Sequence, residues 1–140
     1  QSEGVVVQSL VSTLDITPTV LRILGIAHPA RAQVSGKDLT PSFRGRDVSR
    51  DIFSETDYRL YTHKRSVETP EGWKLILTME TGARELYNTR SDPGEHENLA
   101  ERELARADRL ERKIRQHLEE MNANGPWVLG CTPVYGDQCR

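Results

Sequence analysis

The chain has 140 residues, enough to bury a hydrophobic core and too few for a large enzyme with its own cofactor machinery. Its formal net charge of -2 gives no basic field for nucleic acid and no polybasic anchor for an anionic membrane, so we expect neither partner. No apolar run approaches the length of a bilayer span. The first residue is Gln1, with no initiator Met and no signal peptide, which predicts that an upstream part is missing.

The N-terminal segment is predicted to be a strand followed by a short helix. Residues 5–12 are rich in β-branched side chains and almost continuously apolar, as in a buried strand. In the helix that follows, Thr17 can cap the N-terminus, Pro18 suits the first helical position and Gly25 supplies a left-handed stop. Asp15 is expected to bond to nearby backbone as a capping or strand-end residue. Such a segment is half of an α/β unit, and the sequence offers it no partner strand.

A long connection and a series of short strands come next. Residues 29–50 are rich in Pro, Gly, Ser and charge, which indicates an irregular connecting segment. Beyond it, the sequences "PEG" and "ETG" are typical of hairpin turns between strands. The predicted strands are residues 51–56, 64–69, 72–79 and 84–89. Three or four antiparallel strands result.

The last regular element is an amphipathic helix over residues 99–121. Its apolar side chains recur in steps of three and four and form one stripe, while the opposite face is charged. The stripe consists of Leu104, Ala107, Leu110, Ile114, Leu118 and Met121. The predicted fold class is therefore α+β: a small antiparallel sheet of three to four strands packed on a long C-terminal helix and preceded by one strand–helix unit.

Residues 85–101, "ELYNTRSDPGEHENLAE", gather carboxylates, an Asn and a His, and so raise the question of a metal site. A calcium-binding EF-hand loop would need its Gly and its acids at other positions, so calcium is not expected here. Structural roles account for the residues. Asp92-Pro93-Gly94 is predicted to make a tight turn. Asn98 is predicted to cap the long helix, with Glu101 completing a capping box.

Cys131 and Cys139 are the two cysteines of the chain. They lie close together in the sequence, and a disulfide between them is favoured over two free thiols. A disulfide would predict an oxidising compartment, that is, a secreted, periplasmic or lysosomal-type protein.

The acid-rich segment also resembles the end of the C-terminal subdomain of sulfatases, where Glu-Leu-Tyr leads into Asp-Pro-x-Glu-x-x-Asn-Leu and the final helix. Four more segments resemble that family in the same order: "VSTLDITPTVLRILGI", "GKDLTPSFRG", "IFSE" and "RSVETPEGWKLIL". The tail "GPWVLGCTPVYGDQC", together with "RSVET", resembles the heparan N-sulfatase (sulfamidase) branch and related bacterial sulfatases. Nearly the whole chain thus resembles the C-terminal part of a sulfatase, a member of the alkaline-phosphatase-like superfamily.

The resemblance implies hydrolysis of sulfate esters or sulfamates by a formylglycine beside a calcium ion. Formylglycine arises from the Cys or Ser of a Cys/Ser-x-Pro-x-Arg motif. "CTPVY", which starts at Cys131, has Tyr135 in place of that Arg, so we interpret Cys131 as a disulfide partner. The calcium ligands of the family lie upstream, and the chain alone is expected to hold no catalytic residue and no metal and to be inactive.

The same resemblance implies a division of the chain into three parts. Residues 1–28 would be the last strand–helix unit of an α/β catalytic domain, and residues 29–50 the connection after it. Residues 51–140 would form the C-terminal sheet and helix subdomain with its cysteine-containing tail.

Residues 57–65, "DYRLYTHKR", are the candidate for contact with substrate. Four basic side chains gather there: Arg59, His63, Lys64 and Arg65. These side chains could hold an anionic sugar through charge-assisted hydrogen bonds, and the resemblance implies that loops of the small sheet border the pocket. The alternative is a solvated hairpin whose cations pair with Glu55, Asp57 or Glu68.

Two functions follow from these observations. The chain is either the C-terminal portion of a sulfatase that supports and borders the active site, or a non-catalytic binding module for sulfated glycans. The first predicts an exposed apolar patch at Val5, Val7 and Leu21, where a missing N-terminal catalytic domain would pack or a homo-oligomer would form through the exposed strand edge. An unrelated α+β domain would require five ordered resemblances to be accidental.

Overall fold

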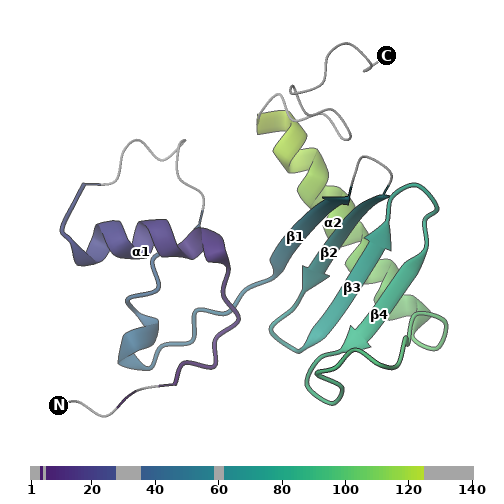
Figure 1. Ribbon diagram of the computed structural model, residues 1–140, viewed down its shortest axis with the longest axis horizontal. Coiled ribbons are helices and arrows are strands. Elements are labelled where there is room, and N and C mark those ends of the chain that lie inside the picture. The colour runs from purple at the N-terminus through teal and green to yellow at the C-terminus, as the bar shows by residue number, and fades with distance from the viewer. Residues whose placement is uncertain (1–3, 5, 28–35, 59–61, 125–140) are drawn as a thin grey trace. The chain divides into compact units, whose positions relative to one another are not determined.

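The computed structural model describes residues 4, 6–27, 36–58 and 62–124, with side chains up to residue 121. The chain forms two compact units, Gln1–Ile52 and Phe53–Arg140. The first unit contains helix α1, and the second contains a four-stranded sheet and helix α2 (Figure 1). Within the ranges described, no helix combines the length and the hydrophobicity needed to cross a bilayer.

The first unit is built around one short helix. Its elements are the 3-10 turn η1 (Thr13–Asp15), helix α1 (Ile16–Ile23) and the 3-10 turn η2 (Ser42–Arg44). Ser12 opens the first turn with a capping box, because its hydroxyl accepts from the Leu14 N–H and the Asp15 carboxylate accepts from the Ser12 N–H. Thr17, which the sequence predicted as the cap, lies inside α1. That prediction was wrong, because the turn begins at Ser12.

Gly25 ends the helix as predicted. Its φ of 66° lies in the left-handed region that glycine tolerates best. The Gly25 N–H donates to the carbonyl of Arg22, and the Ile26 N–H donates to that of Leu21. These bonds satisfy carbonyl groups that the end of a helix would otherwise leave open.

The strand predicted at residues 5–12 does not form over the part described, residues 6–12. A strand needs a neighbouring strand to complete its ladder of hydrogen bonds, and the described residues supply side chains instead. The Leu10 N–H donates to Ser49 Oγ, and the Val48 N–H donates to Ser9 Oγ. The apolar run therefore has no sheet to enter.

Apolar side chains are left exposed on this unit. Ile16, Val20 and Ile23 are 59%, 46% and 62% exposed, at the spacing of one helix face. Of the patch that the sequence predicted, Val7 is exposed, Leu21 is only partly so, and Val5 lies outside the described residues. The exposed surface follows the outer face of α1 rather than Leu21.

The second unit has the predicted α+β fold. Its elements are β1 (Ile52–Tyr58), β2 (Thr62–Glu68), β3 (Trp73–Thr78), β4 (Arg84–Asn88) and α2 (Leu104–Asn124). The strands lie in the order β1-β2-β3-β4, and β3 pairs antiparallel with both β2 and β4. The register sets Arg65 opposite Leu77, and Leu75 opposite Leu86. All four predicted strands are confirmed.

Glycines close two of the hairpins at the predicted turns. Gly72 in the "PEG" turn has φ 83°, and Gly82 in the "ETG" turn has φ 70°. The Thr69 N–H donates to the carbonyl of Trp73 in the first, and the Thr78 N–H donates to that of Ala83 in the second.

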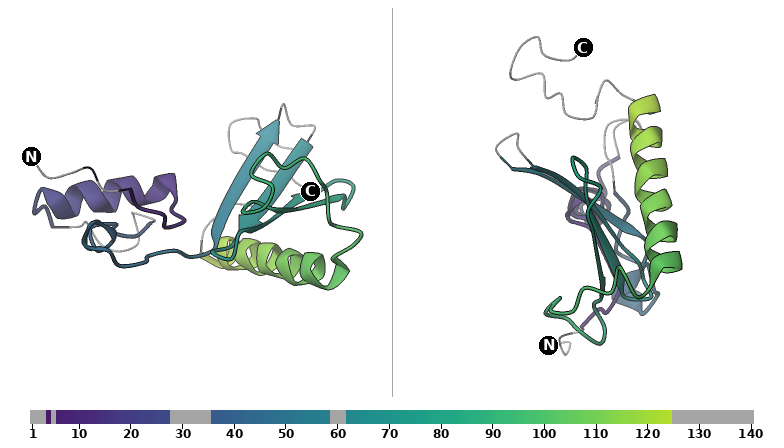
Figure 2. Two further views of the ribbon diagram at one scale, coloured as in Figure 1. Left: turned by 90° about the horizontal axis from the view of Figure 1, so that it is seen from below. Right: turned by 90° about the vertical axis from the view of Figure 1, so that its right-hand side faces the viewer.

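One face of the sheet carries the core. Alternate residues of β2, β3 and β4 point to this face, and α2 covers it, as the right-hand view of Figure 2 shows. The buried set is Val67, Leu75, Leu77, Leu86, Ala100, Ala107, Leu110, Ile114 and Leu118. The helical stripe predicted from Ala107 to Leu118 is therefore confirmed as core, while Leu104 stays 55% exposed.

Helix α2 begins at Leu104 rather than at residue 99, and Asn98 does not cap it. The Asn98 side chain bonds to strand β4 instead: its Oδ1 accepts from the Leu86 N–H, and its Nδ2 donates to the carbonyl of Arg84. The Leu99 N–H also donates to the carbonyl of Leu86. The predicted capping box was wrong because this segment binds the open edge of β4, which the sequence pattern does not reveal.

Candidate functional site

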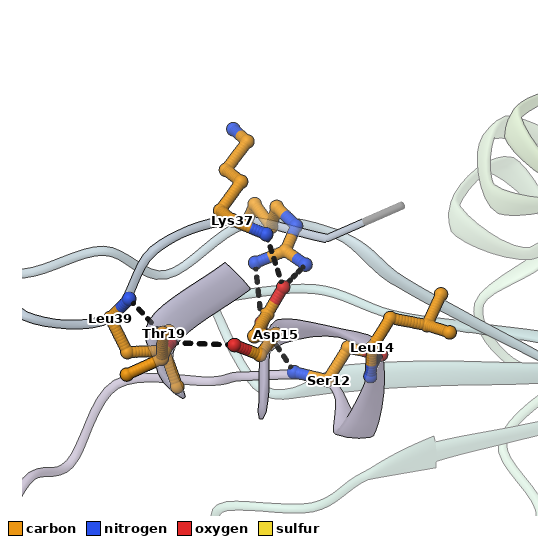
Figure 3. Close-up of polar contacts among 7 residues, drawn as sticks. Ser12, Leu14, Asp15, Thr19, Lys37 and Leu39 are labelled. Atoms are coloured by element: carbon orange, nitrogen blue, oxygen red, sulfur yellow. Dashed lines mark hydrogen bonds and ion pairs between the residues drawn. The ribbon is translucent and has the colours of Figure 1, made fainter. Parts of the chain in front are cut away.

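The polar centre of the first unit is Asp15, whose side chain is fully buried. Figure 3 shows that three separate segments converge on its carboxylate. The backbone N–H groups of Ser12 and Lys37 donate to it at 2.9 and 2.7 Å. Arg50 donates from both terminal nitrogens, at 2.5 and 2.9 Å. This is a paired, fully bonded buried charge, which is how proteins retain an ionised group in the interior.

Burial would by itself raise the pKa of Asp15, since it disfavours the charged form. The hydrogen bonds from Arg50 and from the two backbone N–H groups outweigh burial, and the pKa is lowered below its usual value. Asp15 is therefore an ionised anchor at neutral pH and not a proton donor.

Thr19 extends this anchor by one more link. Its hydroxyl donates to the carbonyl of Asp15 at 2.6 Å and accepts from the Leu39 N–H at 2.9 Å. Gly36 lies against the same turn, and a Cβ at this position would stand 2.2 Å from the Leu14 carbonyl oxygen. The start of α1 and residues 36–39 are thus held together by hydrogen bonds from the Lys37 and Leu39 N–H groups to the Asp15 and Thr19 side chains, and the close approach requires a glycine at position 36.

Three of the four sequence-predicted contact residues, His63, Lys64 and Arg65, lie on β2 of the second unit, and each has a carboxylate partner. Lys64 Nζ lies 2.8 Å from Glu85 Oε1, on the sheet face opposite the core. Glu80 Oε1 accepts from the His63 N–H at 2.6 Å and also bonds to His63 Nδ1. Arg59, the fourth predicted residue, lies outside the described residues.

Arg65 is buried on the core face of the sheet, beside the edge strand β1. Its Nη1 donates to Asp57 Oδ1 at 2.6 Å. Its Nε lies 3.2 Å from Glu55 Oε2 but without the alignment of a hydrogen bond, so this buried N–H is unsatisfied. Arg65 therefore ties β1 to β2, which is the pairing that the alternative interpretation expected for this residue.

The charge balance of this region does not favour capture of an anion. Four carboxylates surround the β2 cations: Glu55, Asp57, Glu80 and Glu85. Only Lys64 and Arg65 among the described basic residues of this stretch carry a permanent positive charge near neutral pH. Each described cation of this stretch thus has a carboxylate partner, which weakens its attraction for an anion in solvent.

The acid-rich segment after β4 has structural roles, as predicted. Asp92 Oδ2 accepts from the N–H groups of His96 and Glu97 at 2.7 and 2.9 Å. The Glu97 N–H is the first cause of the lowered pKa of Asp92. Glu95 adopts a left-handed φ of 54° and pairs with Lys74 at 2.7 Å. Over the part of the chain described, no three His, Cys, Asp or Glu side chains gather as a metal ion would need.

Sequence reasoning missed three partners: Arg50, Glu80 and Glu85. Arg50 is 35 residues from Asp15, and no local pattern links the two. Glu85 could have been found, because the hairpin register puts it on the same sheet face as Lys64. Cys131 and Cys139, the predicted disulfide, lie outside the described residues.

Comparison with known proteins places the two units in one family. The family model described as "N-sulphoglucosamine sulphohydrolase, C-terminal" matches residues 1–124, which includes the Asp15 anchor, the whole sheet and α2. The chain belongs to this sulfatase C-terminal family. The resemblance found in the sequence to the C-terminal part of a sulfatase is thereby confirmed.

Relatives of this sulfatase C-terminal domain are much longer. A Delta 4,5-hexuronate-2-O-sulfatase of Bacteroides thetaiotaomicron is 37% identical over an alignment of 95 residues, and the match covers 63% of this chain and 19% of that protein. A solved 2-O GAG sulfatase is 31% identical with a TM-score of 0.59, over 79% of this chain and 24% of that one. A third structure, solved with D-glucosamine-2-N,6-O-disulfate as its substrate, is 20% identical with a TM-score of 0.57 and shares the fold, over 79% of this chain and 23% of that one.

Proposed function

We propose that the chain is the C-terminal portion of a longer sulfatase that hydrolyses sulfate esters of glycosaminoglycan sugars. The family match over residues 1–124 carries this proposal. The hexuronate-2-O-sulfatase and the 2-O GAG sulfatase described above are both named for 2-O-sulfatase activity, so a 2-O-sulfated uronic acid is the first substrate to test. Sulfamate hydrolysis, which the family description suggests, is the second.

The chain would support and border the active site without supplying its reactive groups. Formylglycine and calcium are expected in the sulfatase family, and the described residues offer no cluster that fits a metal ion. Our proposal assigns both groups to an upstream catalytic part, as the resemblance to sulfatases implies. No step of the reaction is assigned to residues of this chain.

Helix α1 supports the idea of an upstream partner. Its exposed face carries Ile16, Val20 and Ile23, and apolar faces of this kind are normally covered by another layer. The occupant that we propose is the catalytic part of the same polypeptide. The self-association expected from the sequence would use the same face when that part is absent.

The test is a sulfate-release assay on two samples, the 140-residue chain and the longer polypeptide that carries it. The substrates are an unsaturated 2-O-sulfated disaccharide and N-sulfoglucosamine. We expect the longer polypeptide to release sulfate and the chain alone to release none. Turnover by the chain alone, or none by the longer polypeptide, would overturn the proposal.

A binding module for sulfated glycans is the competing function. The excess of carboxylates around β2 counts against it, because such modules depend on unpaired cations. Saturable heat in a titration of the chain with heparin fragments at low salt, in a polypeptide without sulfatase activity, would favour it.

A further inference from the structure

We propose that Glu80 fixes the His63 ring so that its Nε2 accepts a hydrogen bond from a hydroxyl group of the substrate sugar. Glu80 is then a positioning residue, and His63 a residue that recognises the neutral part of a sulfated sugar. This inference rests on the proposed sulfatase function, since it requires that the β2 end of the sheet borders the pocket.

The first step is the geometry of the pair. Glu80 follows β3, in the turn to β4, and Oε1 of its carboxylate holds His63 twice: through the backbone N–H at 2.6 Å and through ring Nδ1. The His63 carbonyl is held as well, because it accepts from the Met79 N–H at 2.9 Å. Backbone and ring are thus fixed together, while the side chain keeps 21% of its surface exposed.

The second step is the tautomer. The pKa of Glu80 is lowered, first by its own backbone N–H and further by its bonds to His63, so the carboxylate is ionised at neutral pH. An ionised carboxylate can only accept hydrogen bonds, and Nδ1 must therefore carry the proton of the ring. In a neutral imidazole with Nδ1 protonated, Nε2 presents a lone pair and acts as an acceptor.

The third step is the kind of group that such a nitrogen fits. Sulfate oxygens are acceptors and would face a lone pair at Nε2. They would also meet the carboxylate of Glu80. A sugar hydroxyl can donate a hydrogen bond to Nε2, and because it is neutral it is not repelled by the neighbouring carboxylate. Lys64 and Arg65, the other described candidates of this stretch, are committed to carboxylates.

The test compares two substrates in the longer polypeptide that carries this chain. One is an unsaturated 2-O-sulfated disaccharide, and the other is an aryl sulfate, which has no sugar hydroxyl. We expect His63→Phe to lower the ratio of the two kcat/KM values, disaccharide over aryl sulfate, by about 3- to 10-fold, the effect of one hydrogen bond. His63→Gln keeps an acceptor and should retain more of the ratio than His63→Phe.

Glu80→Gln should lower the same ratio, because an amide can also donate to Nδ1 and no longer selects the tautomer. Glu97→Gln is the matched control, since Glu97 is an exposed carboxylate that bonds to Arg102 away from β2. It should leave the ratio unchanged. Nitrogen NMR of His63 in the 140-residue chain gives a readout independent of activity, and we expect the proton on Nδ1 in the wild type and a mixture of tautomers in Glu80→Gln.

Three outcomes are distinguishable. A wild-type His63 ring with its proton on Nε2, or a ratio that His63→Phe leaves unchanged, overturns this inference and leaves the sulfatase function standing. Equal loss on both substrates also overturns it, because that result indicates general damage to the site. No activity of the wild-type polypeptide on either substrate or on N-sulfoglucosamine overturns the proposed function, and this inference with it.

Discussion

Asp15 and Arg50 form a two-pronged ion pair across 35 residues of sequence, with both guanidinium Nη atoms on the carboxylate of a fully buried aspartate. This pair connects the start of α1 to the end of the segment that leads into the sheet. Because the carboxylate has no access to water, its ionised form is stabilised only by its protein partners, Arg50 and the two backbone N–H groups.

Removing Arg50 should therefore cost far more than removing an exposed arginine. We expect Arg50→Ala to lower the free energy of unfolding by about 3 kcal/mol, because it leaves Asp15 as a buried charge without its partner. The control is Arg22→Ala: Arg22 lies 3.9 Å from Asp38 and is 74% exposed, so its loss should cost less than about 0.5 kcal/mol. Urea denaturation of both variants measures the difference, and equal costs would show that the buried pair contributes nothing special.

The Asp15 anchor should weaken in acid. Its pKa is lowered in the folded state, so it contributes stability above the unfolded value of about 3.9 and loses that contribution as pH falls through the folded value. The difference in unfolding free energy between the wild type and Asp15→Asn should be constant from pH 7 to about pH 5 and shrink below about pH 4. A difference that grows in acid would contradict the direction of the shift.

The two hairpin glycines should respond differently to alanine. Both have positive φ, which disfavours alanine. At Gly82 open space surrounds the position, so Gly82→Ala should lower the free energy of unfolding by about 1 kcal/mol through backbone strain alone. Gly72→Ala should cost more, because its Cβ would stand 2.5 Å from Arg90 Cγ and displace a side chain that bonds to the Pro70 carbonyl at 2.6 Å. Thermal unfolding of the two variants gives the order, and a smaller loss for Gly72→Ala would contradict this account.

Polar substitutions on the outer face of α1 should separate folding from association. Val20→Lys and Ile23→Lys are expected to change the free energy of unfolding of the chain by less than about 0.5 kcal/mol, because both positions are exposed. The same variants should reduce self-association in sedimentation and binding of a hydrophobic dye. In the longer polypeptide they should lower stability. No effect in either sample would remove α1 as a packing surface.

Local patterns were sufficient for most of the second unit. Alternating apolar residues and turn glycines predicted all four strands and two of their connections, because each signal lies within a few residues of the element it specifies. The apolar stripe of α2 was predicted for the same reason. Its start was not, because the Asn98 side chain and the Leu99 N–H bond to β4, and these are tertiary contacts.

The first unit and the site depended on contacts that local patterns do not encode. The segment before α1 has the composition of a strand, but a strand forms only beside another strand. The sequence predicted the basic residues of β2 as candidate substrate contacts, and two of their partners, Glu80 and Glu85, lie 17 and 21 residues further along the chain. Pairing of Arg65 with Glu55 and Asp57 was an alternative that the sequence offered, whereas the partners of His63 and Lys64 are seen only in the folded sheet.

The segment that covers the outward edge of β4 limits how these molecules can aggregate. On the outward edge of β4, the carbonyl groups of Arg84, Leu86 and Asn88 and the Leu86 N–H are bonded to residues 92–99 of the same chain. A fibre that grows by strand addition needs two unpaired sheet edges on every subunit, one for each neighbouring subunit. Because residues 92–99 cover the β4 edge, two molecules could pair their sheets only through their β1 strands. Such a pair would offer no further edge, and assembly would end at the dimer.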